Sequence, residues 1–99
     1  MLNLKEHLLV KLSEECSEIT KAAMKALRFG LDDRGPNGIL TNVELVKYEI
    51  IDLYVVIDMM IENGLMVHRA NIDPKDLALR RERIGRYMNY SRERGMLEK

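Results

Sequence analysis

The sequence predicts an all-α protein. Three segments with helical periodicity occupy most of the 99 residues, and no stretch alternates apolar and polar residues for long enough to form a strand. Seven Met, one Phe and no Trp favour a core of aliphatic and methionine side chains, which suits helix packing. A chain of this length fits a single domain over residues 1–99.

The first predicted helix runs from about Asn3 to Phe29 and ends at Gly30. The connector after it, "GLDDRGPNGIL", holds three glycines and a proline, which predicts one loop. Because the only cysteine lies on the apolar stripe of this helix, we expect it to be a buried, inert thiol. The stripe follows the i, i+3 and i+4 spacing of one helix face and consists of Leu8, Leu12, Cys16, Ile19, Ala23 and Ala26.

The second and third helices have clear start signals. Thr41 followed by Glu44 predicts a capping box at the start of the second helix, and Gly64 is its expected C-terminal glycine. The dipeptide Asp73-Pro74 supplies an N-cap and a first-turn proline for a third helix, from Lys75 to about Arg94.

The second helix is apolar on nearly all sides. Leu53 and Val56 lie on one side with Leu45 and Met60, whereas Ile51, Tyr54 and Val55 lie well away from it. Two other helices in a chain of this size hardly cover both sides. We therefore expect a homo-oligomer, a dimer or tetramer, in which a helical hairpin plus a third helix assembles into four-helix-type bundles.

Carboxylates lie within the most apolar segment, "EIIDLYVVIDMM". On a helical wheel Glu49 and Asp52 share the centre of the face formed by Leu45, Val56 and Met60. An ionised carboxylate on an apolar face is costly unless it is paired or coordinates a cation. Glu49 and Asp52 thus predict a positive group opposite them.

The first helix offers a second acidic pair, Glu15 and Glu18, which flanks the core stripe. One such pair alone is usually an ordinary solvated helix face. Two pairs on two packable helices, however, converge four carboxylates on one point. Oxygen ligands at that density suit a hard divalent ion, Mg²⁺ or alternatively Mn²⁺.

The acidic segments "EECSE" and "EIID" resemble the Glu-Glu-x-x-Glu and Glu-x-x-Asp signature of MazG-type nucleoside triphosphate pyrophosphohydrolases. The resemblance covers residues 8–62 well and the rest loosely. It implies the all-α superfamily that includes dimeric dUTPases and phosphoribosyl-ATP pyrophosphatases, with Mg²⁺-dependent cleavage between the α- and β-phosphates. It also implies that the metal-binding catalytic residues are Glu15, Glu18, Glu49 and Asp52, with Glu14 as an additional ligand or a contact to a second metal ion.

The third helix departs from the family pattern. Its "RRERIGRY" has arginine where lysine is usual, and no asparagine precedes it at the expected position. Arg80, Arg83 and Tyr87 nevertheless fall on one flank of the apolar stripe, where guanidinium groups would clamp phosphate oxygens. An ordinary solvated helix is an equal alternative. Lys25 of the first helix projects close to Glu18 and is a further candidate for substrate binding.

The overall charge narrows the choice of partners. Sixteen basic and sixteen acidic residues cancel, which argues against a nucleic-acid or membrane binder. The family resemblance implies a nucleoside triphosphate substrate. No signal peptide or membrane span is evident, and we expect a cytoplasmic protein. The alternative is a non-enzymatic helical module that binds DNA or protein through the basic third helix.

Overall fold

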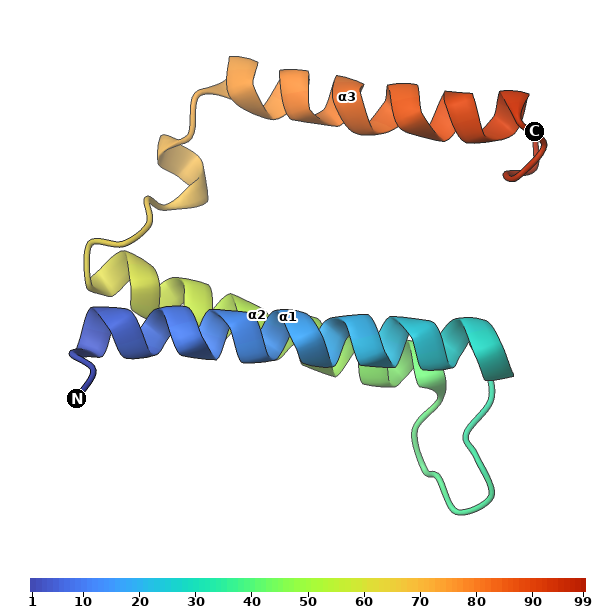
Figure 1. Cartoon of the computed structure of the whole chain (residues 1–99), viewed down its shortest axis with the longest axis horizontal. Coiled ribbons are helices and arrows are strands. Elements are labelled where there is room, and N and C mark those ends of the chain that lie inside the picture. Colours follow the sequence, from blue (N-terminus) through green and yellow to red (C-terminus); the bar gives the residue numbers. More distant parts are fainter. The chain divides into compact units, whose positions relative to one another are not determined.

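The computed structural model describes residues 1–99, and all of its regular elements are helices (Figure 1). The predicted all-α class is therefore confirmed. The chain divides into two compact units, residues 1–66 and 67–99, which are described separately here. The expectation of one domain over the whole chain stays a prediction. The elements are α1 (Leu4–Phe29), α2 (Asn42–Glu62), a short 3₁₀ helix η1 (Arg69–Asn71) and α3 (Pro74–Glu93).

Local capping explains where the helices begin. The Thr41 hydroxyl accepts from the backbone N–H of Glu44 at 3.2 Å, and the Glu44 carboxylate accepts in return from the Thr41 backbone, as predicted. Asp73 caps α3 through the Lys75 N–H at 2.9 Å. An equivalent box at the start of α1, between Asn3 and Glu6, was missed by the sequence analysis.

The first unit is an α1–α2 hairpin with a thin core. α1 and α2 lie side by side (Figure 1), and their buried contact centres on Leu8, Val56 and Met60. Leu8 is only 2% exposed. The prediction of a buried Cys16 was wrong, because its side chain is exposed although its neighbours along the stripe are at least partly covered.

α2 keeps a large apolar surface uncovered in the single chain. Ile51, Tyr54 and Val55 are about half exposed or more, on the sides that sequence analysis placed away from the core. The hairpin partner therefore covers only one side of this helix. No helix in the chain combines the length and the apolar character that crossing a bilayer requires.

Asn42 stabilises the loop between α1 and α2 through hydrogen bonds. Its side-chain Nδ2 donates to the Gly30 carbonyl at 2.8 Å, and its backbone N–H donates to the Asp33 carbonyl at 2.9 Å. The next residue continues this pairing, since the Val43 N–H donates to the Leu31 carbonyl at 3.0 Å. Asn42 is 1% exposed, so the loop end and the start of α2 are held as one piece.

Candidate metal centre

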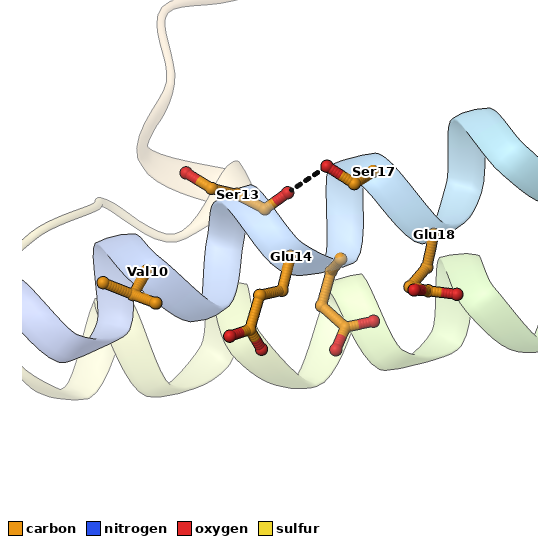
Figure 2. A pocket seen from close by; sticks show the side chains of 6 residues that line it. Val10, Ser13, Glu14, Ser17 and Glu18 are labelled. Carbon is orange, nitrogen blue, oxygen red and sulfur yellow. Dashed lines mark hydrogen bonds between the residues drawn. The ribbon is translucent and has the colours of Figure 1, made fainter.

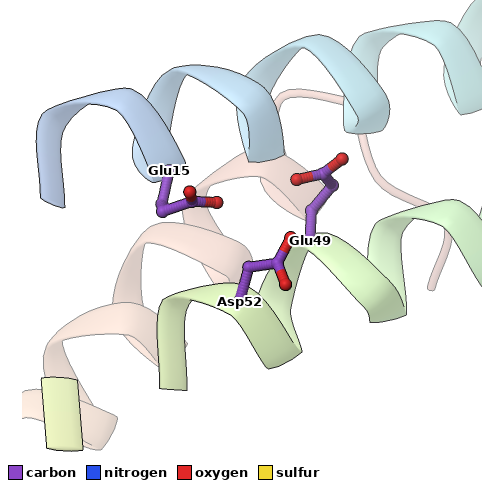
Figure 3. Close-up of side chains that lie close together, drawn as sticks. All are labelled: Glu15, Glu49 and Asp52. Atoms are coloured by element: carbon purple, nitrogen blue, oxygen red, sulfur yellow. The ribbon is translucent and has the colours of Figure 1, made fainter. Parts of the chain in front are cut away.

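Three acidic side chains meet in the space between α1 and α2. Glu15 comes from α1, whereas Glu49 and Asp52 come from α2, where their i, i+3 spacing places them on one face (Figure 3). One carboxylate oxygen from each lies within 4.8 Å of the others. The structure thus brings together three of the four predicted ligands.

The three carboxylates are not equally covered. Glu15 and Glu49 are partly buried, but Asp52 is exposed. The prediction that Asp52 sits at the centre of a buried apolar face was therefore wrong. The reason is that α1 covers the Val56 and Met60 side of α2, while Met59 on the Asp52 side stays exposed. Asp52 marks the solvent-facing edge of the cluster.

No cation of the protein neutralises this cluster. The chain has a single salt bridge, between Lys11 and Glu14 at 2.8 Å, so none of the three acids is ion-paired. Desolvation raises the pKa of Glu49 above its ordinary value, and the charges of Asp52, Glu18 and Glu15 raise it further. Ionised Glu49 therefore has no salt-bridge partner.

Glu18 and Glu14 lie outside the three-residue cluster. Glu18 acts on it through space, because its charge is among those that raise the pKa of Glu49. Glu14 instead binds Lys11, whose hydrogen bond and charge lower the pKa of that carboxyl. Three of the four carboxylates that were expected to converge therefore do so. The ligand roles of Glu18 and Glu14 stay predictions.

The acidic face of α1 borders a surface pocket of about 490 Å³. Figure 2 shows Glu14 and Glu18 on one side of the helix and Ser13 and Ser17 on the other, with the Ser17 hydroxyl donating to the Ser13 carbonyl at 3.0 Å. Glu15 also lines this pocket, which links it to the cluster. Because all of its lining residues belong to α1, it is an open hollow on the surface of that helix.

A smaller pocket of about 150 Å³ lies on the other side of the cluster and contains Lys25, the predicted cationic residue of α1. Glu18 and Glu49 line it as well. The structure therefore places Lys25 near Glu18, as the helical wheel indicated, and also near Glu49.

The third-helix candidates belong to the second unit. Arg83 and Tyr87 line a pocket of about 380 Å³ on α3 together with Arg86 and Tyr90. Arg80 is exposed and does not line it. The roles predicted for Arg80, Arg83 and Tyr87 toward a substrate stay predictions.

Comparisons with protein-family models, with curated protein sequences and with solved structures found no match for this chain. The site is therefore described from the chemistry of its own side chains.

The donor set fits a hard divalent ion. All donors are carboxylate oxygens, which Mg²⁺ and Mn²⁺ prefer. Two oxygens on opposite sides of one Mg²⁺ are about 4.2 Å apart, twice the usual bond length of about 2.1 Å. Only one pair of three ligands can take opposite positions, and oxygens in adjacent positions are about 3.0 Å apart. The oxygens of Glu15, Glu49 and Asp52, which lie within 4.8 Å of one another, therefore have to approach by side-chain rotation to hold one ion.

Glu49→Gln should stabilise the chain at neutral pH when divalent ions are absent. The raised pKa means that the folded state holds the Glu49 proton more tightly than the unfolded state does. Ionisation of Glu49 therefore costs stability above its folded pKa, and the cost disappears as pH falls below the ordinary value of 4.5. The melting temperature of Glu49→Gln in EDTA should exceed that of the wild type at pH 7, with a difference that vanishes at pH 4. A lower melting temperature at pH 7 would contradict this account.

Proposed function

We propose that the chain is a divalent-metal-dependent hydrolase of the MazG type that converts nucleoside triphosphates to the monophosphate and pyrophosphate. The observation that carries the proposal is the cluster of Glu15, Glu49 and Asp52, three carboxylates from two helices without a cationic partner. The acidic segments that form it are the ones that resemble the family signature, and an open hollow on the surface of α1 adjoins them.

In this proposal Glu15, Glu49 and Asp52 hold Mg²⁺ or Mn²⁺. When bound, the ion neutralises charge on the phosphate oxygens and acidifies water. Glu18 has no cationic partner and orients the attacking water by accepting its proton. The water oxygen becomes part of the nucleoside monophosphate, and the bond between the α-phosphorus and the bridging oxygen breaks to release pyrophosphate.

Product analysis tests the reaction type. The purified chain is incubated with each ribo- and deoxyribonucleoside triphosphate and Mg²⁺, and the products are separated by anion-exchange chromatography. We expect nucleoside monophosphate and pyrophosphate in equal amounts, and no products when EDTA is added. Nucleoside diphosphate with inorganic phosphate, or the absence of hydrolysis across the panel, would overturn the proposal.

Self-association is part of the proposal, because one chain leaves Ile51, Tyr54 and Val55 of α2 uncovered. A dimer or tetramer that buries this side would complete a four-helix bundle around each hairpin. Sedimentation equilibrium at micromolar concentration should give a mass of two or four times 11.5 kDa. A single 11.5 kDa species would contradict this expectation.

Arg83→Ala should weaken substrate handling far more than folding. Arg83 is exposed, and exposed substitutions usually change stability by about 0.5 kcal/mol or less. A charge-assisted bond to phosphate is worth about 1.5 to 3 kcal/mol, so kcat/KM should fall by at least about tenfold.

The matched control for Arg83 is Arg81→Ala. Arg81 is exposed and makes no hydrogen bond, unlike Arg92, which donates to Asn89 Oδ1 at 2.7 Å and to the Glu98 carbonyl. Unchanged kinetics in both variants would show that α3 is not part of the phosphate site.

The alternative function is a non-enzymatic module that binds DNA or protein through α3. The exposed Arg83, Arg86, Tyr87 and Tyr90 favour it, since arginine and tyrosine are common in binding surfaces. It assigns no role to the acidic cluster of the first unit. Absence of hydrolysis together with DNA or protein binding that Arg83→Ala abolishes would support it.

A further inference from the structure

The small pocket beside the acidic cluster has a lining suited to part of a ligand. Besides Glu18, Lys25 and Glu49, it is bordered by Lys21 and Ala22 of α1 and by Asn42 and Leu45 of α2. Its volume of about 150 Å³ is below the roughly 300 Å³ at which pockets for whole small molecules begin. A ring-sized group, and not a complete nucleotide, matches this space.

Asn42, which borders this pocket, carries an unsatisfied acceptor. The side chain is 1% exposed, and its buried Oδ1 accepts no hydrogen bond. The orientation of the amide is fixed, because Nδ2 donates to the Gly30 carbonyl at 2.8 Å and a flipped amide would oppose two acceptors there. A buried acceptor without a partner is costly, and a ligand N–H would remove that cost.

We propose that this pocket holds the base of the nucleoside triphosphate, with a ring N–H or amino group of the base donating to Asn42 Oδ1. The assignment rests on the proposed function. Glu49 supports the assignment of the base to this pocket, because this residue belongs to the acidic cluster and also lines the pocket. A substrate whose phosphates lie at the cluster would therefore have its uncharged end within reach of Asn42.

The lining also argues against a phosphate in the pocket. Asn42 Oδ1 and the carboxylates of Glu18 and Glu49 are acceptors, which repel an anion and attract a donor. Ala22 and Leu45 offer the apolar contact that a planar ring makes. Lys21 and Lys25 also line the pocket, and because both are exposed they can reach phosphates that extend out of it.

Ala22→Leu tests the pocket without disturbing the hydrogen bonds of Asn42. Titration calorimetry with Mg²⁺ compares inorganic triphosphate with the α,β-imido analogues of the nucleoside triphosphates, which resist α–β cleavage. Wild-type chain should bind at least one analogue about tenfold more tightly than inorganic triphosphate. Ala22→Leu should remove this advantage and leave inorganic triphosphate unaffected. Thr20→Leu, an exposed change on the same helix outside the pocket, should retain both affinities.

Changes to the ligand test which group of the base donates the hydrogen bond to Asn42 Oδ1. In the analogue that binds most tightly, each ring N–H or amino group is methylated or removed in turn. At one of these positions the change should weaken binding at least about tenfold, because a site built to accept a hydrogen bond rejects ligands that lack the donor. A loss that follows only removal of a sugar hydroxyl would overturn the assignment to the base. The assignment would also be overturned if the wild type bound no nucleotide analogue more tightly than inorganic triphosphate. The same holds if Ala22→Leu left the affinity for the nucleotide analogues unchanged.

Hydrolysis of the unmodified triphosphates, measured on the same samples, separates the two proposals. Hydrolysis without a binding advantage for the nucleotides overturns the base pocket and leaves the proposed function standing. The predicted binding pattern without hydrolysis overturns the proposed function and supports the base pocket.

Discussion

Asp52→Asn is expected to abolish Mg²⁺-dependent release of pyrophosphate, with turnover reduced more than about 100-fold. Even groups that only support a metal ligand are worth about 10- to 100-fold in metal affinity or activity, and Asp52 is proposed as a ligand itself. Steady-state assays with a coupled pyrophosphate readout measure the effect. Glu49→Gln should give a loss of similar size, because it contributes an oxygen to the same cluster.

The fold should survive these replacements. Asp52 is exposed and makes no hydrogen bond or salt bridge, so Asp52→Asn removes a like charge from the cluster without breaking a contact. Asp58→Asn is the matched control, since it is an exposed aspartate of the same helix outside the cluster, and it should retain activity. Strong destabilisation of Asp52→Asn and Glu49→Gln in EDTA would make these acids structural.

Leu8→Ala should produce the largest loss of stability from a single apolar replacement. Leu8 is 2% exposed and packs against Val56 and Met60 in a core of very few buried side chains. Leucine-to-alanine changes at buried sites lower the free energy of unfolding by about 2 to 5 kcal/mol. That is a large share of the roughly 5 to 15 kcal/mol that stabilises an ordinary domain.

Urea unfolding measures this loss as a lower midpoint. Leu27→Ala, on the same helix but 73% exposed, is the control and should shift the midpoint little. Equal losses in the two variants would mean that the Leu8 contacts are not the centre of the fold.

The helices were predictable because their signals are local. Thr41 with Glu44, and Asp73 with Pro74, act within one helical turn, so the sequence predicts where α2 and α3 begin. Burial was less predictable, because it depends on which side of a helix its neighbour covers. A wheel projection contains no such information, which is why the exposure of Cys16 and Asp52 was missed.

The candidate site was predicted in the same partial way. Glu15 and Glu18 were predicted together, but the structure includes only Glu15 in the cluster. On the helical wheel Glu18 projects about 120° from Leu12 and Glu15 only about 60°, so Glu18 lies further from the helix partner. Asn42 was missed altogether. Its burial results from the path of the 30–41 loop, which brings the Gly30 carbonyl to its side chain, and no local pattern encodes that path.

Titration calorimetry with Mn²⁺ tests most directly whether the acids of both helices form one cation site. The account predicts saturable binding to the wild type that is lost in Glu15→Gln from α1 and equally in Asp52→Asn from α2, and that persists in Asp58→Asn. No saturable binding by the wild type, or undiminished binding in Glu15→Gln and Asp52→Asn, would contradict it.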